Sequence, residues 1–428
     1  MKREDIAKLN TPLSGRRGVG GEAFKTSARQ LLEENILPFW LDKMVDYEHG
    51  GFYGRMDGHG HLYAQADKGA VLNARILWTF AAAFRVLGRQ EYLAAAIRAK
   101  EYILKHFIDK KRGGIYWSVN YKGEPVDMKK QSYAIGFAIY GMSELYRAAG
   151  DKEALNCAIA LFNVLEAHAF DAKNVGYIEA LNYDWLPVGD MRLSYKDENG
   201  SRTMNTHLHI LEPYTNLYRS LATVSSDGKD VIRERVGEKL RVLINIFTER
   251  LLNKDTCHLD LFFNDEWQGK RNIASYGHDI EAAWLLTEAL EVLEDKTLTD
   301  EVMPIVNKIA IASEEGLCPD GSMIHECTVS LEDGLPVSCD TDRHWWVQCE
   351  NVIGQLNQYQ HFHDEQALKR AFACYQYILD HLVDREHGEW YWSIRPDGSV
   401  NRDDDKAGPW KCPYHNSRLC LEIMEREF

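Results

Sequence analysis

The segment Ala70-VLNARILWTFAAAF-Arg85 carries apolar residues on almost every side of a helical projection. A helix that is apolar all round is buried on all sides, as it would be between two layers of a larger fold. The segment Arg233-ERVGEKLRVLINIF-Thr248 also has a helical period, but its apolar residues lie on one face, which is typical of a helix that borders solvent. The sequence therefore predicts buried inner helices and one-sided outer helices.

Segments of these two kinds alternate along the chain in six pairs. A repeated helical pair indicates a repeat architecture, and six pairs are the pattern of an all-α fold, the (α/α)6 toroid. We expect a single barrel domain over residues 22–428, preceded by a flexible segment over residues 1–21. The predicted outer helices lie near residues 22–43, 91–108, 152–169, 230–252, 298–313 and 364–382. The predicted inner helices lie near residues 68–88, 131–149, 206–223, 279–294, 345–361 and 412–426.

A short turn pattern recurs between the helices: an Asp, a few polar residues, one or two Gly, and then aromatic residues. Gly-rich turns beside alternating aromatic residues favour short β-hairpins. The pattern occurs as Asp46-YEH-Gly50-Gly51-Phe52-Tyr53, Asp109-KKR-Gly113-Gly114-Ile115-Tyr116-Trp117, Asp171-AKN-Val175-Gly176-Tyr177 and Asp384-REH-Gly388-Glu389-Trp390-Tyr391-Trp392. We therefore expect short hairpins in the loops that connect the helices.

The charge and composition of the chain exclude several functional classes. A net charge of −15 and a pI of about 5.6 argue against nucleic acid and membrane surfaces as partners, because both attract clusters of Lys and Arg. The N-terminal stretch lacks the apolar core of a secretory signal, and no uninterrupted apolar run approaches the roughly 18 residues of a membrane span. Nine Cys without a CxxC pair are typical of free thiols in a reducing cytoplasm. We expect a cytoplasmic monomer. The 11 Trp and 21 Tyr favour a carbohydrate ligand, because their rings stack on sugars, or they simply fill the core.

Side chains capable of chemistry gather at the starts of the predicted inner helices. Because all inner helices of a toroid point the same way, their first turns surround one mouth of the barrel. Polar and aromatic groups that converge there form a pocket without any local motif. These residues are Arg75, Tyr133, Asn205, His209, His278, Glu281, Trp345, Trp346, Trp410 and His415.

Sequence spacing suggests how some of these side chains work together. Asn205 and His209 are four residues apart and share a helix face, whereas His207 points elsewhere. His278 and Glu281 are three residues apart, so the carboxylate could orient the imidazole and raise its basicity. The alternative for any one His is a satisfied core residue, and for His278 with Glu281 an ordinary surface pair.

The sequence offers no clear site for a metal ion or a nucleotide. His207-x-His209 and Cys412-x-x-His415 contain metal-ligand types, but neither forms a recognised zinc spacing with a second pair. The chain has no GxGxxG, GxxxxGK[ST] or GxSxG motif. Arg75 lies in an apolar helix, where it requires either a buried ion pair or a cavity. We therefore expect a cofactor-independent site without a metal.

Four segments of the chain resemble those of cellobiose 2-epimerases, which sit within the N-acylglucosamine 2-epimerase superfamily together with β-1,4-mannobiose 2-epimerases. The resemblance runs through the chain from about residue 22, and its four blocks occur in the family's order. The blocks are Met204-NTHLHILE-Pro213, Ser275-YGHDIEAA-Trp284, Arg343-HWWVQC-Glu350 and Trp410-KCPYHNS-Arg418. The resemblance implies an (α/α)6 barrel, in agreement with the repeat count.

The resemblance also implies roles for individual residues. It implies that the three catalytic His are His209, His278 and His415. It implies that the residues that bind substrate are Arg75, Tyr133, Asn205, Glu281, Trp346 and Trp410. Similar family members act on cellobiose, lactose or β-1,4-mannobiose, so a small oligosaccharide is the expected partner.

Inversion of carbon 2 requires ring opening, removal of the C2 proton to give an enediolate, and return of a proton to the opposite face. Imidazole suits these steps because its ordinary pKa of roughly 6.5 populates both forms near neutrality. We expect His278 and His415 to serve the two faces of C2, with His209 and Arg75 stabilising charge on O1. Glu281 would hold the His278 tautomer.

Other functions fit the same sequence pattern. A glycoside hydrolase on this barrel would need two carboxylates, which Asp279, Glu281, Asp342 and Glu350 could supply. An aldose–ketose isomerase would return the proton to C1, and an epimerase of free mannose or N-acetylglucosamine would take a single sugar. A binding protein without catalysis would have no need of three titratable His.

Overall fold

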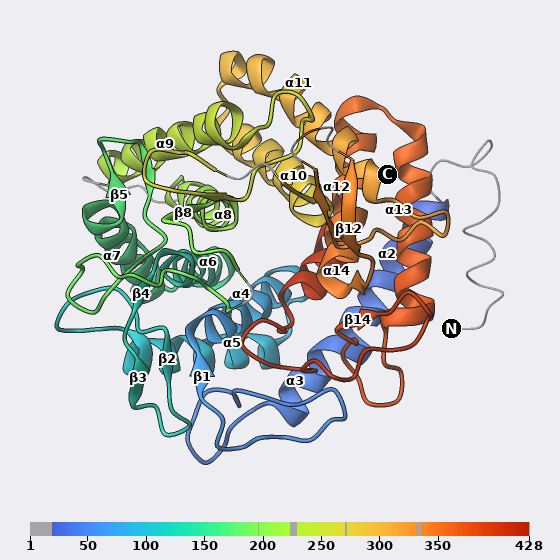
Figure 1. Ribbon diagram of the computed structural model, residues 1–428. Coiled ribbons are helices and arrows are strands. Elements are labelled where there is room, and N and C mark those ends of the chain that lie inside the picture. The colour runs from blue at the N-terminus through green and yellow to red at the C-terminus, as the bar shows by residue number, and fades with distance from the viewer. Residues whose placement is uncertain are drawn as a thin grey trace.

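Two concentric layers of helices form a closed ring in the computed structural model, which describes residues 19–195, 197–222, 229–269, 272–330, 332 and 335–427 (Figure 1). The inner layer consists of α4 (Ala70–Leu87), α6 (Ser132–Ala149), α8 (Met204–Leu221), α10 (Tyr276–Leu293), α12 (Trp345–Phe362) and α14 (Tyr414–Glu425). The outer layer consists of α2 (Val19–Leu31), η1 (Leu32–Ile36), α3 (Leu37–Lys43), α5 (Gln90–Tyr102), η2 (Ile103–Phe107), α7 (Lys152–His168), α9 (Lys229–Ile246), η3 (Phe247–Leu251), α11 (Lys296–Ser313), η4 (Glu314–Gly316), α13 (Glu365–Tyr377) and η5 (Ile378–Leu382). The predicted (α/α)6 toroid is confirmed. Of the segment predicted to be flexible, residues 1–18 lie outside the described residues.

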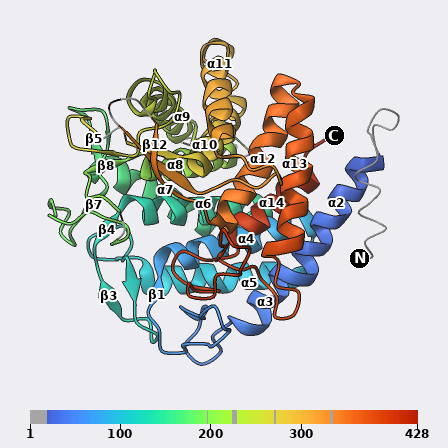
Figure 2. The same ribbon diagram turned by 45° about the vertical axis from the view of Figure 1, so that its right-hand side comes forward.

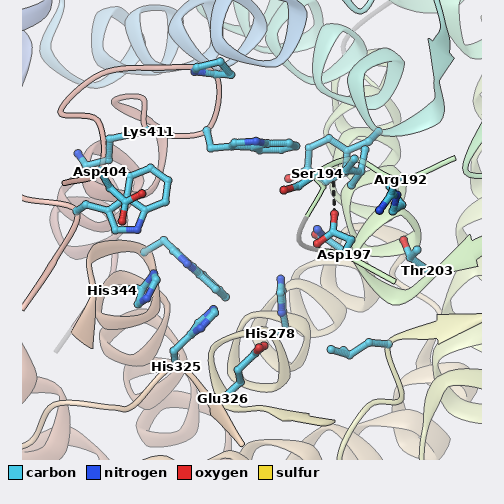
Figure 3. A pocket seen from close by; sticks show the side chains of 18 of the residues that line it. Arg192, Ser194, Asp197, Thr203, His278, His325, Glu326, His344, Asp404 and Lys411 are labelled. Carbon is cyan, nitrogen blue, oxygen red and sulfur yellow. Dashed lines mark hydrogen bonds between the residues drawn. The ribbon is translucent and has the colours of Figure 1, made fainter. Parts of the chain in front are cut away.

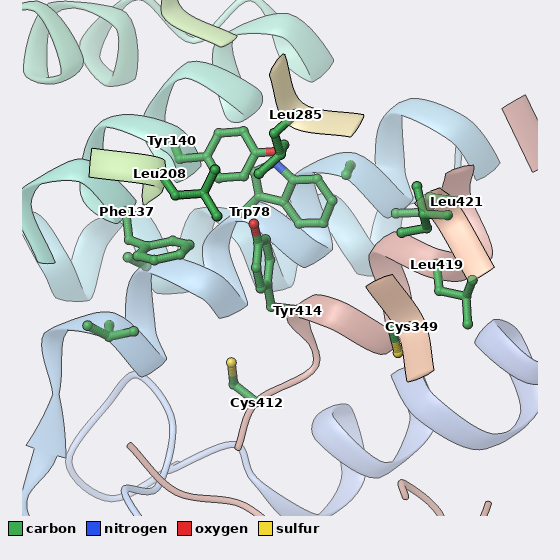
Figure 4. Close-up of a cluster of buried hydrophobic side chains, with 14 of the residues drawn as sticks. Trp78, Phe137, Tyr140, Leu208, Leu285, Cys349, Cys412, Tyr414, Leu419 and Leu421 are labelled. Atoms are coloured by element: carbon green, nitrogen blue, oxygen red, sulfur yellow. The ribbon is translucent and has the colours of Figure 1, made fainter. Parts of the chain in front are cut away.

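The inner helices are apolar because they are covered on all sides. Every residue of α4 from Ala70 to Ala83 is buried. By length and composition α4 could cross a membrane, but 78% of it is buried inside the protein, and it is the one such helix in the described part of the chain. At the centre of the barrel, aromatic rings from three inner helices pack together: Trp78 stacks on Tyr140 with 5.2 Å between ring centroids and meets Tyr414 edge-on at 5.3 Å (Figure 4). Much of the aromatic content therefore builds the core.

Short strands link each repeat to the next. A strand precedes each of the first five inner helices and pairs with a strand from a later loop, in the sheets β1-β2-β3, β4-β7, β8-β9, β10-β11-β12 and β13-β14; β5 pairs with β6 within one loop. The bounds are β1 (Lys68–Gly69), β2 (Ser118–Val119), β3 (Pro125–Asp127), β4 (Lys130–Gln131), β5 (Phe170–Asp171), β6 (Gly176–Tyr177), β7 (Ala180–Leu181), β8 (Arg202–Thr203), β9 (Phe262–Phe263), β10 (Ile273–Ser275), β11 (Glu326–Val329), β12 (Pro336–Asp340), β13 (Arg343–His344) and β14 (Ser393–Ile394). Helix α14 packs against α2 and α4, which closes the ring (Figures 1 and 2).

The predicted hairpin turns follow the outer helices, and two further copies exist that the motif did not reveal. The six antiparallel bridges join Val45 to Phe52, Ile108 to Ile115, Phe170 to Tyr177, Leu252 to Leu259, Leu317 to Met323, and Val383 to Trp390. The fourth copy begins with Asn253 in place of Asp and has Cys257 at a positive φ of 64°, where the first, second and last copies use Gly. The fifth begins at Cys318, with Asp320 and Gly321 adjacent and no aromatic residue directly after them. Neither copy has the spacing of the motif, so the sequence pattern missed both.

In four of the six turns, a buried or half-buried ion pair joins the turn to the segment that leads into an inner helix. Lys68 Nζ lies 2.7 Å from Asp46 Oδ2, and Lys130 Nζ lies 2.7 Å from Asp109 Oδ2, with all four side chains fully buried. Lys406 pairs with Asp384 in the last repeat, and Arg202 with Asp171 at 2.5 Å in the third. Each lysine also neutralises a carboxylate whose other oxygen accepts backbone N–H groups of the turn, as Asp109 does from residues 111 and 112. The pairs fix the loops at the mouth of the barrel.

The prediction that all nine Cys are free thiols is wrong for two of them. Cys327 and Cys339 form a disulfide, because antiparallel pairing of β11 with β12 places them directly opposite each other. Their separation of 12 residues gave no CxxC signal. The other seven Cys are free.

Replacing Lys130 with Met should destabilise the protein strongly, because it leaves the Asp109 carboxylate buried without its cation. Breaking a buried pair in this way costs about 3–5 kcal/mol, measurable as a loss in the free energy of unfolding by urea. Arg112→Met is the matched control: its pair with Asp184 is about half exposed, and such pairs contribute about 0–1 kcal/mol. Equal losses in the two variants would contradict a structural role for the buried pairs.

Candidate active site

A cavity of about 920 Å³ opens at the mouth where the inner helices begin. The ten residues predicted at the helix starts all line it: Arg75, Tyr133, Asn205, His209, His278, Glu281, Trp345, Trp346, Trp410 and His415. The irregular insert between β7 and β8 contributes Arg192, Ser194 and Asp197 to one wall, facing His278, His325 and His344 across the space (Figure 3). The repeat therefore brings together residues that lie up to 340 positions apart, Arg75 and His415.

Beneath the cavity, one guanidinium group holds three carboxylates. Arg418 Nη2 lies 2.7 Å from Glu281 Oε1 and 2.7 Å from Glu350 Oε1, while its Nη1 donates to Glu212. The four side chains come from α14, α10, α12 and α8 and are buried to within 1%. Tyr414 also donates its hydroxyl to Glu212. Such a network must be fully paired, because an uncompensated charge at this depth is strongly destabilising.

Two of these carboxylates orient two of the histidines. His415 Nδ1 lies 2.7 Å from Glu350 Oε1, and His209 Nδ1 lies 3.1 Å from Glu212 Oε2. A neutral imidazole beside a carboxylate donates its N–H to it, so the proton of each ring sits on Nδ1. The Nε2 atom of each ring is then an unprotonated acceptor, as a general base requires.

A kink in α8 sets the position of His209. Pro213 lies four residues further on and lacks the N–H that would bond the His209 carbonyl, so His209 adopts a non-helical φ of −88° and ψ of 17°. The neighbouring helix accommodates the kink with a glycine: a Cβ on Gly136 would lie 2.3 Å from the His209 carbonyl oxygen. Pro213 and Gly136 thus place the His209 ring at the cavity wall.

The predicted pairing of His278 with Glu281 is wrong. His278 Nδ1 lies 2.8 Å from Ser275 Oγ, at the end of the strand that precedes α10. Glu281 instead turns toward Arg418, whose full charge attracts the carboxylate more strongly than a neutral imidazole does. The second oxygen of Glu281, Oε2, is buried without a hydrogen-bond partner in the described part of the chain. His278 therefore has no carboxylate of its own.

Burial changes the protonation of all three histidines. It lowers the pKa of His278 to about 3, with further lowering by His325, His209 and His415. It also lowers the pKa of His209, where Glu212 opposes the shift, and that of His415, where Arg75 and Arg418 add to it. The expectation that both imidazole forms are populated near neutrality is thus revised: all three rings are neutral in the free protein.

The same burial acts in the opposite direction on Glu281. Burial and then the charge of Glu350 raise the pKa of Glu281 well above its ordinary value, even though Arg418 opposes the shift. Glu281 therefore keeps its proton near neutral pH and can donate a hydrogen bond into the cavity. For Glu212, burial also favours the neutral acid, but Arg418 and His209 outweigh it and lower its pKa overall.

Arg75 supplies positive charge without a carboxylate. Its Nη2 donates to Tyr133 Oη at 2.8 Å, and its guanidinium lies 4.1 Å from the Phe137 ring centroid and 4.8 Å from that of Tyr414. No ion pair to Arg75 occurs among the described residues. Of the two explanations for this residue, the structure favours the cavity-facing cation. A buried guanidinium of this kind stabilises an oxyanion.

Several other candidates from the sequence lie outside the cavity. His207 Nε2 accepts the Tyr177 N–H at 3.0 Å and its Nδ1 lies 2.7 Å from the Thr203 carbonyl, so both ring nitrogens are engaged. Asp279 pairs with His258 at 2.7 Å. Trp267 packs against His207 and does not line the cavity either.

Sequence reasoning missed the network of Glu212, Glu350 and Arg418, as well as Ser275. Charged residues inside otherwise buried helices were the available signal, since the same argument singled out Arg75. Two clusters of side chains have potential metal-ligating atoms within 4.8 Å of one another. The first consists of Glu281, Glu350 and His415, and the second of His325, Asp340 and His344. In the first, Arg418 already donates to both carboxylates. In the second, the imidazole planes differ by only 16°, so their lone pairs do not converge on one metal position.

Comparison with known proteins agrees with this fold. The family model for N-acylglucosamine 2-epimerase matches residues 51–418. The chain is 55% identical over 403 residues to cellobiose 2-epimerase of Bacteroides fragilis, covering 94% of this chain and 99% of that one. It is 38% identical to cellobiose 2-epimerase of Ruminococcus albus, over 93% and 97% of the two chains. The structure of cellobiose 2-epimerase from Bacillus thermoamylovorans superposes with a TM-score of 0.86 at 38% identity, over 95% of this chain and 100% of that one.

The chain therefore belongs to the N-acylglucosamine 2-epimerase family, as the resemblance of its motifs implied. It is a carbohydrate epimerase, and so an isomerase.

The low pKa of His278 predicts an unusual pH dependence. Because its neutral form persists well below pH 6, the specificity constant kcat/KM should show no acid limb with a midpoint near the roughly 6.5 of free imidazole. Initial rates between pH 5 and 8, with circular dichroism to verify folding at each pH, measure this. An acid limb centred at or above roughly 6.5 would show that the catalytic imidazoles are not desolvated.

Proposed function

We propose that this enzyme reversibly epimerises carbon 2 of the reducing-end aldose in β-1,4-linked disaccharides. The observation that carries the proposal is a single cavity in which three neutral imidazoles and an unpaired guanidinium surround the same space. The activity named for the relatives in Bacteroides fragilis and Ruminococcus albus supports the choice of cellobiose. Lactose and β-1,4-mannobiose are further substrates of the same linkage, and we propose that no metal or nucleotide is needed.

In the proposed mechanism, His415 and His278 act on opposite faces of C2. His415 Nε2 takes the C2 proton, and Glu350 stabilises the imidazolium that forms, because it already accepts the Nδ1–H. His278 exchanges the proton on the other face. His209, held by Glu212, and Arg75 stabilise negative charge on O1 of the enediolate.

The remaining cavity residues bind the sugar in this proposal. Glu281, as a carboxylic acid, donates a hydrogen bond from Oε2 to a sugar oxygen. Asn205 Oδ1 is also buried without a partner in the described part of the chain, and it accepts a hydrogen bond from a sugar hydroxyl. Trp346 and Trp410 offer half-exposed rings at the wall, and Tyr133 lies 5.9 Å from the Trp410 ring. Indole faces stack on the apolar faces of sugar rings. We further propose a monomer that works in the cytoplasm.

Rival activities are less well supported by the same geometry. Among the carboxylates considered for a hydrolase, Asp279 is tied to His258 away from the cavity, and Glu350 is tied to Arg418 and His415. A cavity of about 920 Å³ exceeds the needs of one monosaccharide, which argues against a free-sugar epimerase. An aldose–ketose isomerase would share the enediolate and differ only in the carbon that is reprotonated.

Incubation with cellobiose in D2O tests the proposal. We expect an intact disaccharide with a mannose reducing end and deuterium at its C2, because a histidine proton exchanges with solvent before it returns. The reaction should proceed in EDTA without added nucleotide. NMR of the products distinguishes the rivals: free glucose indicates a hydrolase, and a ketose labelled at C1 indicates an isomerase.

Variants of the histidines test the two faces. His278→Gln and His415→Gln should each abolish epimerisation, while each retains C2 exchange of only one epimer, and of opposite epimers. His209→Ala should slow exchange of both epimers about 10²–10³-fold, as for loss of an oxyanion donor. His207→Ala should remain active, because both its nitrogens serve the fold. Near-normal epimerisation by His415→Gln would instead indicate one base and rotation about C2–C3.

The protonated state of Glu281 has its own test. Glu281→Gln places an amide where the carboxylic acid donates, and its carbonyl can still accept from Arg418. We expect this variant to retain most activity, whereas Glu281→Ala loses both the donor and the partner of Arg418. A Gln variant as inactive as the Ala variant, with unchanged thermal stability, would show that Glu281 acts as a carboxylate.

A further inference from the structure

The two proposed C2 proton carriers differ in how they can hold a proton. His415 has Glu350 at 2.7 Å, so a carboxylate balances its imidazolium. His278 has the neutral hydroxyl of Ser275 as the one hydrogen-bond partner of its ring in the described part of the chain, and its pKa of about 3 shows how poorly it keeps a proton. A proton that reaches His278 must therefore leave it, and one that His278 delivers must arrive from elsewhere.

Because the proton leaves C2 on one face and returns on the other, His278 must exchange a proton with its surroundings in every turnover. In each turnover one histidine gains the proton taken from C2 and the other loses the proton returned to C2. The enzyme then carries its protons in exchanged positions, and the next turnover in the same direction requires them to be restored. Glu350 and its neighbours are sealed beneath the cavity, so restoration on the His278 side needs a path of its own.

A fourth imidazole lies beside His278. His325 stands between His344 and His278 at the cavity wall (Figure 3), and its charge is one of the groups that lower the pKa of His278. Both rings pack against the same indole: His278 lies 4.7 Å and His325 5.8 Å from the Trp346 ring centroid. Both rings also line the open cavity, so a proton can pass between them through water or a sugar hydroxyl that occupies it.

A carboxylate orients this fourth imidazole and reaches solvent. His325 Nδ1 lies 3.0 Å from Asp340 Oδ2, so the ring donates from Nδ1 and leaves Nε2 as an acceptor. The Asp340 side chain is 44% exposed and that of His325 19%. Hydrogen bonds from His325 and His344 hold the pKa of Asp340 far below its ordinary value, so it stays a carboxylate. Two other titratable groups lie close by: His344 stacks on His325 with 4.2 Å between ring centroids, and Glu326 lines the cavity from the same hairpin.

The hairpin that carries this pair is cross-linked. The backbone N–H of His325 donates to the carbonyl of Asp340 at 3.1 Å, and Glu326 is paired in register with Asp340. One residue further along the strands, the disulfide of Cys327 and Cys339 joins β11 to β12. The arrangement of His325 and Asp340 is therefore fixed by the hairpin before substrate binds.

We propose that His325, oriented by Asp340, relays protons between His278 and solvent and so restores the enzyme after each turnover. The inference rests on the proposed two-face mechanism. The His278 imidazolium passes its proton to His325 Nε2, and Asp340 balances the charge until His325 releases the proton to water; the reverse sequence loads His278. Transfer between the two rings breaks one N–H bond and forms another, and release to water breaks the N–H bond of His325 and forms an O–H bond. His325 does not touch the reacting carbon and acts as a positioning and supply group for His278.

His325→Gln in the full-length enzyme is the test. Because His278 is neutral in the free enzyme, it must be loaded before a proton returns to C2, so the relay enters both kcat and kcat/KM for cellobiose. We expect both constants to fall about tenfold, below the roughly 10²–10⁴-fold effect of a direct acid–base residue. Added imidazole, a diffusible proton carrier, should restore kcat in proportion to its concentration.

Two further variants keep the result interpretable. Asp340→Asn retains the His325 ring but removes its counter-charge, and it should show a smaller loss of kcat with the same imidazole rescue. His361→Gln is the control: that ring lies near Glu291 at 3.5 Å, toward the end of α12 opposite the mouth, and its removal should change neither kcat nor the response to imidazole.

Losses of activity in His325→Gln and Asp340→Asn that added imidazole does not rescue would overturn the relay. This outcome differs from failure of the proposed function, in which His278→Gln itself would still epimerise cellobiose. If imidazole rescues His325→Gln, and His278→Gln is inactive, both the relay and the proposed two-face mechanism are supported.

Discussion

The site depends on one guanidinium group among three buried carboxylates. Arg418 joins α14 to α8, α10 and α12 through Glu212, Glu281 and Glu350, so a single cation sets the spacing of four inner helices. The same carboxylates hold His209 and His415. One positive charge cannot balance three negative ones at this depth, so the network keeps a proton on Glu281, and Arg75 supplies the second cation nearby. The network that fixes the spacing of the helices therefore also determines which of these groups carries a proton.

A second constraint brings the cavity residues to one place. In four of the six repeats, ion pairs such as that of Lys130 with Asp109 fasten a turn to the segment that leads into an inner helix, and the first turns of the inner helices face one mouth. No local motif is required there, because six repeats each contribute one or two side chains. The loops between repeats form the outer wall of the cavity, where Arg192 and Asp404 lie (Figure 3).

The sequence predicted the helices and the ring of cavity residues because both follow from periodicity. It failed where partners come from distant segments. The pairing of His278 with Glu281 assumed that an i, i+3 spacing decides the contact, but Arg418 from α14 outcompetes the imidazole. The contact between Glu350 and His415 crosses two helices 65 residues apart and has no signal in either one. The hairpin at Asn253 escaped detection because Asn and a residue at positive φ replaced Asp and Gly.

The central claim is that the buried carboxylates fix His209 and His415 as neutral rings with Nδ1 protonated and Nε2 free. Nitrogen-15 NMR of the imidazole side chains at pH 7, assigned with the His209→Ala and His415→Gln variants, measures this directly. The account predicts for both residues one protonated nitrogen, Nδ1, and one unprotonated nitrogen, Nε2, in the free enzyme. Imidazolium at either position, or a proton on Nε2, would contradict it.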